Sequence, residues 1–175
     1  MNMVRRMRLV WLVALMALSL VATTAAPVGA ATVFTDPNGQ FKAQLADGWS
    51  SQPPPDGFSA VFTVDGGAAL FTVGRDDVTN GTTNVDYATL YAKNIEGKQL
   101  QDYSEVDRYY LKCFTSDKCP VLDYTATDVD GKTQRVAHVF FTSGTDAWVL
   151  TYRTLASNWN KYLDDVNAML GSFTV

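Results

Sequence analysis

Two consecutive runs of β-branched and aromatic residues near the C-terminus place the strongest limit on the fold. Residues 136–142 and 147–154 form these runs, and the turn-forming residues 143–146 separate them. This pattern predicts a β-hairpin. In the first run, the positions on both sides of the strand are largely apolar, so we expect this strand to be covered on both faces.

An amphipathic pattern follows the hairpin. Apolar residues recur there at spacings of three and four: Trp159, Tyr162, Leu163, Val166, Met169, Leu170 and Phe173. This spacing predicts one face of a C-terminal helix, and we expect Ser157 or Asn158 to cap its start. A two-faced hairpin with a covering helix predicts a layered domain of helices and strands.

The other elements are expected from alternation and turn residues. Strands are expected over residues 32–35, 40–45, 58–64, 68–73, 102–114, 121–129 and 133–142. Residues 50–57, with three consecutive prolines, are expected to form a stiff loop without ladder pairing. Residues 76–83 are expected to form a polar loop, after which Asn84 is expected to cap a helix of about three turns with Tyr87 and Ile95 on its inner face.

The first thirty residues have the pattern of a secretory signal peptide. Three arginines lie within the first eight residues, an apolar stretch covers 9–22, and small residues follow at 26–31. We expect residues 1–30 to be removed, and residues 31–175 to form a single domain that is secreted or otherwise extracytoplasmic, in the periplasm or cell envelope. An uncleaved membrane anchor remains the alternative, although the apolar run is shorter than the ~20 residues that a membrane span needs.

The charge of the processed chain narrows the class of partner. Without the three leader arginines it carries 11 basic and 18 acidic residues, a net charge of −7. Bulk electrostatics therefore argue against nucleic acid or an anionic membrane surface as the partner.

The cysteine content points to an oxidising compartment. Cys113 and Cys119 are the only cysteines, and in an exported protein we expect them to form a disulfide that closes a short loop. Two unpaired thiols are the alternative. Two cysteines and one histidine are too few for a closed zinc site, so we expect no metal and no cofactor.

Candidate catalytic groups are few. The only histidine, His138, lies in the middle of the two-faced strand and is expected to be a satisfied core or groove residue. No nucleophile motif accompanies it. The aspartate pairs at 76–77 and 164–165 are expected in a loop and on a solvated helix face. Asp128 and Asp130 resemble the start of a calcium loop without its closing glutamate, so we expect a hairpin turn. We therefore predict no catalytic residues.

One polar and aromatic cluster indicates a contact surface. Arg108, Tyr109 and Tyr110 follow one another in a predicted strand, beside the cysteine loop. Successive residues of a strand face opposite sides, so Tyr109 and Tyr110 are expected to point in opposite directions. Exposed tyrosine and arginine are typical of protein interfaces, and these three residues are our candidate partner site.

Several landmarks resemble the PsbP-like family. They are residues 34–41 (FTDPNGQF), 47–49 (DGW), 151–153 (TYR), Trp159 and 170–173 (LGSF). The resemblance covers nearly all of the processed chain. It implies an α+β fold, an α/β/α sandwich with a central, largely antiparallel sheet and a C-terminal helix packed on it.

The resemblance also implies a function. Family members include extrinsic subunits that support the oxygen-evolving complex of photosystem II, and exported bacterial proteins and lipoproteins. The family consists of binding and assembly modules, and none of the calcium or photosystem contacts of its plant members maps onto this sequence. We therefore expect an exported, non-catalytic binding or accessory module that recognises a protein or small ligand. A secreted hydrolase with an unrecognised active site is the alternative.

Overall fold

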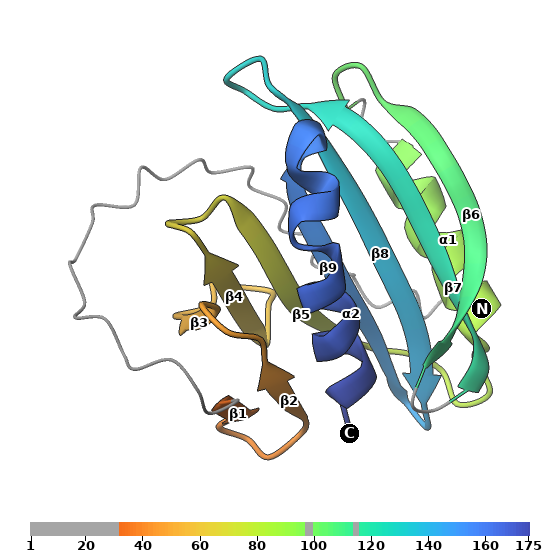
Figure 1. Ribbon diagram of the computed structural model, residues 1–175. Coiled ribbons are helices and arrows are strands. Elements are labelled where there is room, and N and C mark those ends of the chain that lie inside the picture. Colours follow the sequence, from red (N-terminus) through yellow and green to blue (C-terminus); the bar gives the residue numbers. More distant parts are fainter. Residues whose placement is uncertain (1–31, 97–99, 114–115) are drawn as a thin grey trace.

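A seven-stranded antiparallel sheet forms the centre of the computed structural model, which describes residues 32–96, 100–113 and 116–175 (Figure 1). Its strand order is β3-β4-β5-β9-β8-β7-β6. The strands are β3 (Ser50–Gln52), β4 (Ala60–Val64), β5 (Ala69–Asp77), β6 (Ser104–Cys113), β7 (Ser116–Thr127), β8 (Thr133–Ser143) and β9 (Asp146–Leu155). The expected signal peptide lies outside the described residues.

The predicted central hairpin is confirmed as β8 and β9. The two strands pair from Gln134 and Leu155 to Ser143 and Asp146, and Gly144 in the turn has a φ of 64°. Glycine adopts this left-handed conformation without steric cost. Every residue of β8 from 136 to 141 is buried, so the strand is covered on both faces as expected.

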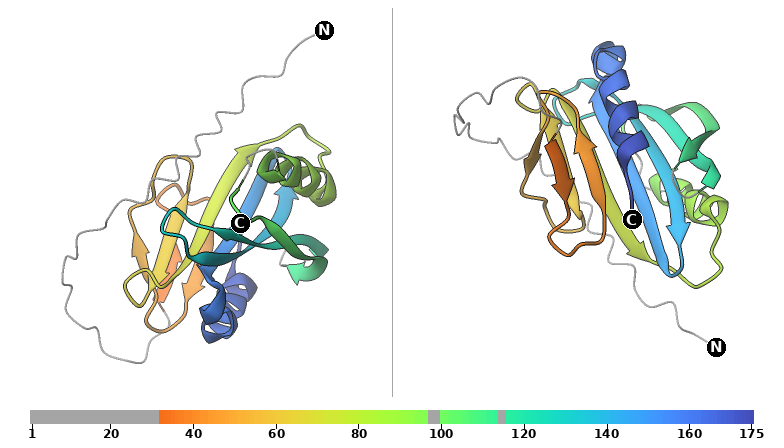
Figure 2. Two further views of the ribbon diagram at one scale, coloured as in Figure 1. Left: turned by 90° about the horizontal axis from the view of Figure 1, so that it is seen from above. Right: turned by 60° about the horizontal axis from the view of Figure 1, so that its bottom comes forward.

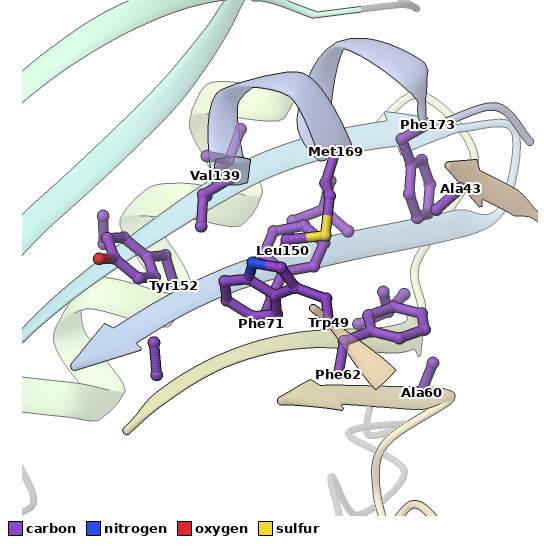
Figure 3. Close-up of a cluster of buried hydrophobic side chains, with 14 of the residues drawn as sticks. Ala43, Trp49, Ala60, Phe62, Phe71, Val139, Leu150, Tyr152, Met169 and Phe173 are labelled. Carbon is purple, nitrogen blue, oxygen red and sulfur yellow. The ribbon is translucent and has the colours of Figure 1, made fainter. Parts of the chain in front are cut away.

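One face of the sheet is covered by α2 (Leu163–Ser172) together with a small hairpin of β1 (Thr32–Thr35) and β2 (Lys42–Leu45). The largest hydrophobic core lies between these elements and the sheet, and Figure 3 shows Met169 of α2 and Phe173, which directly follows α2, reaching into it. Phe173 stacks on Phe41, with 5.0 Å between the ring centroids.

The predicted start of the C-terminal helix is wrong. A 3-10 helix, η1 (Ala156–Lys161), occupies the expected first turn, and α2 follows it with Tyr162 at the N-cap and no side-chain cap bond. Trp159 is nevertheless buried within η1. Tyr152 explains the conformation in part: its hydroxyl donates to the Trp159 carbonyl at 2.8 Å and its ring lies 4.4 Å from the indole.

The opposite face of the sheet is covered by α1 (Asn84–Glu96), so the described fold is an α/β/α sandwich, as the family resemblance implies (Figure 2). Tyr87 and Ile95 are buried against this face, as expected. Asn84 is not the cap. Instead, Thr83 and Asp86 form a reciprocal pair, in which the Thr83 amide donates to Asp86 and the Asp86 amide donates to the Thr83 hydroxyl.

Two predicted loops are partly strand. Residues 50–52 pair with β4 as the edge strand β3, although the three prolines that follow do end it. The second is the predicted polar loop over residues 76–83. Its first two residues belong to β5, which continues through Asp77 because its last residues pair with the start of β9. Within the described ranges, no helix is long and apolar enough to cross a membrane.

Candidate functional site

The strand that carries the predicted partner site, β6, lies at one edge of the sheet (Figure 1). Of the strands that the structure describes, β7 alone pairs with it, and its residues from Ser104 to Tyr110 are all exposed. The opposite edge is the three-residue strand β3, which the proline run follows. Among the described strands, β6 is therefore the long open edge, where backbone N–H and C=O groups point away from the sheet.

The strand register divides the predicted site between the two faces. Tyr109 pairs with Val121, which belongs to the core beneath α2. Arg108 pairs with Leu122, which belongs to the core beneath α1, and Tyr110 shares this face. Directly opposed residues in a sheet point to the same side. Tyr109 therefore faces the α2 side and Arg108 and Tyr110 the α1 side, and the predicted opposition of the two tyrosines is confirmed.

Tyr109 stands beside a charged cluster that the sequence analysis missed. Asp123 on β7 is 2% exposed, and both of its carboxylate oxygens accept bonds from Arg135 on β8, at 3.0 and 2.7 Å. The Arg135 guanidinium lies over the Trp159 ring, 4.2 Å from its centroid. Burial raises the pKa of Tyr109, and the Asp123 charge raises it further. The tyrosine is therefore a neutral hydrogen-bonding group at neutral pH.

This cluster fixes the surface next to β6. A bidentate arginine–carboxylate pair has a defined orientation. The aromatic ring that stacks on one side of the guanidinium group restricts its orientation further. Because Trp159 belongs to η1, the cluster also ties η1 to the outer strands. The exposed Tyr109 thus lies beside side chains that hydrogen bonds and a ring contact hold in one arrangement.

The other side of β6 carries an exposed ion pair. Arg108 donates to Glu105 Oε2 through Nε at 2.8 Å and Nη2 at 2.6 Å. The two side chains are 47% and 37% exposed, so the pair contributes little to stability. Its effect is local: it orients the guanidinium along the strand, beside Tyr110, which is 57% exposed.

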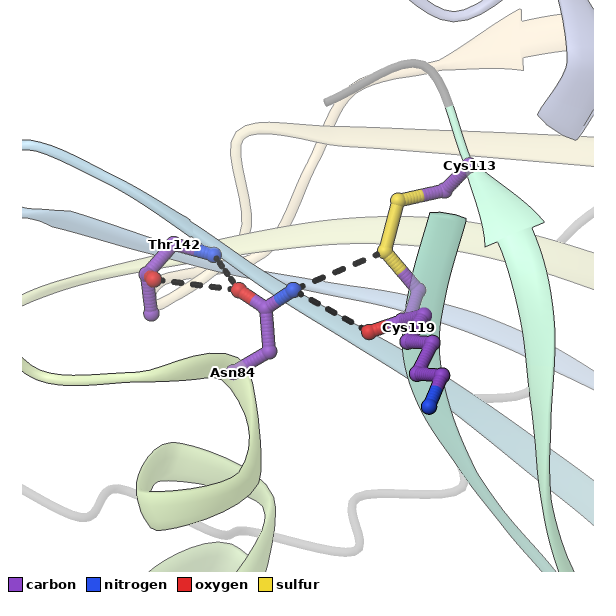
Figure 4. Close-up of a disulfide and its surroundings, with 5 residues drawn as sticks. Asn84, Cys113, Cys119 and Thr142 are labelled. Carbon is purple, nitrogen blue, oxygen red and sulfur yellow. Dashed lines mark hydrogen bonds between the residues drawn. A yellow bond between two sulfur atoms is a disulfide. The ribbon is translucent and has the colours of Figure 1, made fainter. Parts of the chain in front are cut away.

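The hairpin between β6 and β7 is closed by the predicted disulfide between Cys113 and Cys119, whose Cα atoms are 5.9 Å apart (Figure 4). Asn84 connects this hairpin to the centre of the sheet. Its side-chain nitrogen donates to the Lys118 carbonyl at 3.4 Å, and its oxygen accepts from the Thr142 amide at 2.8 Å. Asn84 therefore anchors the cysteine hairpin instead of capping α1.

His138 is the satisfied core residue that we predicted. It is 1% exposed, with Nε2 3.2 Å from the Tyr124 hydroxyl and Nδ1 2.8 Å from the Thr151 hydroxyl. Burial lowers its pKa to about 3, so the imidazole is neutral at neutral pH. Its hydrogen-bond partners are hydroxyl groups and not carboxylates.

The candidate carboxylate sites have structural roles. Asp128 accepts bonds from the Asp130 and Lys132 amides, at 3.0 and 2.9 Å, which confirms the predicted hairpin turn. Asp76 accepts a bond from the buried Tyr87 hydroxyl, and Asp165 accepts one from the Trp49 indole at 3.1 Å. Across the described ranges, no three His, Cys, Asp or Glu residues are grouped to hold a metal ion.

Comparison with known proteins identifies the fold. No protein-family model matches the chain, and no curated protein matches its sequence. Solved structures do match. Cyanobacterial PsbP (CyanoP) from Synechocystis sp. PCC 6803 superposes with a TM-score of 0.57 at 14% identity, over 87% of this chain and 98% of CyanoP.

Two further structures share the architecture. LpqN of Mycobacterium tuberculosis, which is involved in cell envelope biogenesis, gives a TM-score of 0.58 at 15% identity, over 82% of this chain and 88% of LpqN. A Bacteroides thetaiotaomicron protein gives 0.57 at 11% identity over 83% of this chain, which spans only 48% of that protein. The chain therefore has a PsbP-like fold, as the sequence landmarks indicated.

Proposed function

We propose that this protein is an exported, non-catalytic binding or accessory module of the PsbP-like type, which recognises a protein partner outside the cytoplasm through the edge strand β6. One observation carries the proposal: β6 is a long, exposed sheet edge that presents Arg108, Tyr109 and Tyr110. An extended partner segment adds to such an edge through backbone hydrogen bonds, and the alternating side chains supply specificity.

Binding accounts for the site better than catalysis does. The only histidine is buried between hydroxyl groups, both cysteines are joined, and the aspartates described above hold turns and aromatic side chains. Acid–base and covalent catalysis need a reachable titratable group or nucleophile. The exposed side chains of β6 suit contact and not proton transfer.

Export is the second part of the proposal. The leader pattern of residues 1–30 and the joined cysteines both fit an oxidising compartment. LpqN, which shares the fold, is involved in cell envelope biogenesis. These observations support a site of action in the periplasm, in the envelope or outside the cell.

Capture from the organism's own extracytoplasmic fraction tests the proposal. The processed protein is immobilised, and bound proteins are identified by mass spectrometry. We expect Arg108→Ala with Tyr109→Ala to reduce capture strongly while leaving the melting temperature nearly unchanged, because both side chains are exposed. Leu90→Ala, at an exposed apolar position of α1, is the matched control and should capture normally.

Two outcomes contradict the proposal. One is capture that the β6 substitutions leave unchanged, which would place the contact elsewhere. The other is turnover in a broad hydrolase screen that is lost on replacing His138 in a variant that still folds. The second result would support the secreted-hydrolase alternative.

A further inference from the structure

The regularly paired part of β6 is short, and one residue lies at its centre. The pairing of β6 with β7 is irregular between Glu105 and Asp107 and again between Leu111 and Cys113. Between these irregularities, the strand runs regularly from Asp107 to Leu111, and Tyr109 is its central residue. A segment that adds to this edge has five regular positions to pair with.

The charges on β6 complement each other along the strand. Glu105 and Asp107 lie toward its start, Lys112 lies toward its end and Arg108 lies next to its centre, so the strand is neutral in a chain with an acidic balance. An antiparallel copy of the same strand places the end of one beside the start of the other. A second copy of this chain therefore meets complementary charges at β6, in spite of the net negative charge of each copy.

Like-charge contacts exclude most of the possible registers. Two copies of one strand pair antiparallel around a two-fold axis, and the residue on the axis faces its own copy. An axis at Asp107 opposes two carboxylates, and an axis at Arg108 opposes two guanidinium groups. An axis at Tyr110 places Arg108 opposite Lys112. Like charges directly opposite each other destabilise a sheet, so these registers are unfavourable.

An axis at Tyr109 avoids all of these contacts and pairs the whole regular run. The two Tyr109 side chains then face each other on the α2 side. Arg108 lies opposite the second copy's Tyr110 on the α1 side, a pairing that suits a guanidinium and an aromatic ring. Lys112, one position beyond the regular run, comes near the start of the second copy's strand, which carries Glu105 and Asp107. By contrast, an axis at Leu111 would pair the regular run with the irregular end of the second copy's strand. Most residues from Asp107 to Leu111 would then have no regular partner.

We propose that β6 pairs with β6 of a second copy around a two-fold axis at Tyr109, which joins the two central sheets into one. This inference rests on the proposed function, because it names the partner of the same edge. The dimer adds a strand to the long edge of the sheet, where no other described strand follows β6. It also places the two Asp123–Arg135 clusters, which flank Tyr109, on the same side of the joined sheet.

Cysteine cross-linking tests the register. Tyr109→Cys brings two cysteines together across the axis, at a Cα separation of about 4.5–5.5 Å, which a disulfide spans. Tyr110→Cys is the matched control: its two copies are offset by two residues and lie about 8 Å apart, beyond disulfide reach. We expect mild oxidation of the exported protein to link Tyr109→Cys into a dimer and to leave Tyr110→Cys unlinked. Equal linking of both variants would overturn the proposed register.

Sedimentation equilibrium tests the association itself without a new cysteine. We expect the wild-type protein to show a concentration-dependent dimer. Tyr109→Lys opposes two positive charges on the axis and should abolish the dimer while the circular dichroism spectrum is retained. Leu90→Lys, at a similarly exposed site on α1, should not change the dimer.

A wild-type protein that stays monomeric at every accessible concentration overturns the inference. If that monomer still captures another protein through Arg108 and Tyr109, β6 takes an extended segment of a different chain and the proposed function stands. If it captures nothing, both proposals fail.

Discussion

His138 shows how burial changes the behaviour of one residue. In the folded protein burial lowers its pKa to about 3, whereas in the unfolded chain the pKa is near 6.5. Below pH 6.5 the unfolded chain therefore takes up a proton that the folded protein does not. The folded state is thus favoured fully above pH 6.5, and this contribution is lost progressively as the pH falls toward 3.

A pH-dependent denaturation experiment measures this effect. We expect the free energy of unfolding to fall by about 1 kcal/mol between pH 7 and pH 5.5, from the linkage of this single group. His138→Gln removes the only imidazole and should flatten the dependence in this window, where carboxylates titrate little. An equal fall in the variant would mean that another group causes it.

At the scale of elements, the packing of α2 differs from the helical pattern in one respect. Met169 is completely buried, whereas Leu163 and Leu170 are only partly buried at the edge of the same core. The helix begins later than expected, and its buried face is centred on Val166 and Met169. The side chains therefore do not contribute equally, although their spacing makes them look equivalent.

Truncation of Met169 tests the role of α2 as a covering element. We expect Met169→Ala to lower the free energy of unfolding by about 2–5 kcal/mol, because it leaves a cavity in a close-packed core. Leu163→Ala should cost less, since its side chain is already partly exposed. Denaturant unfolding with equal losses for the two variants would contradict this packing.

Alternation and helical spacing predicted most elements because those patterns follow from burial on one or both faces. Helix caps were harder. Thr83 and Asn84 are both good caps, and the choice depends on Asp86, three residues after Thr83, which forms the reciprocal bonds. The start of α2 depends on the contact between Trp159 and Tyr152, which no local pattern encodes.

The sequence predicts the residues of β6 in the candidate site but not the charged cluster beside them. Arg108, Tyr109 and Tyr110 are adjacent, so an exposed strand was a reasonable expectation. The cluster beside them joins Asp123 and Arg135, which come together only through the register of β7 and β8. Likewise, the position of β6 at the sheet edge follows from the strand order, which no single segment determines.

At the scale of the whole molecule, two helical layers protect the centre of the sheet and leave one long edge open. The core residues lie on both sides of β8 and β9, while three strands separate β6 from β5 and no other described strand pairs with its outer side. We therefore expect changes at the exposed residues 104–110 of β6 to leave both cores intact, and under the proposed function to alter contacts with a partner.

Amide hydrogen exchange along β6 tests this account most directly. The protein is compared alone at high dilution and in its assembled state, with a second copy or with the captured partner. We expect new protection on assembly to concentrate in residues 107–111, with little change in α1 or α2, because the added strand bonds to the outward-facing backbone of β6. Protection confined to another element, with the exchange of 107–111 unchanged, would contradict the assignment of β6 as the contact edge.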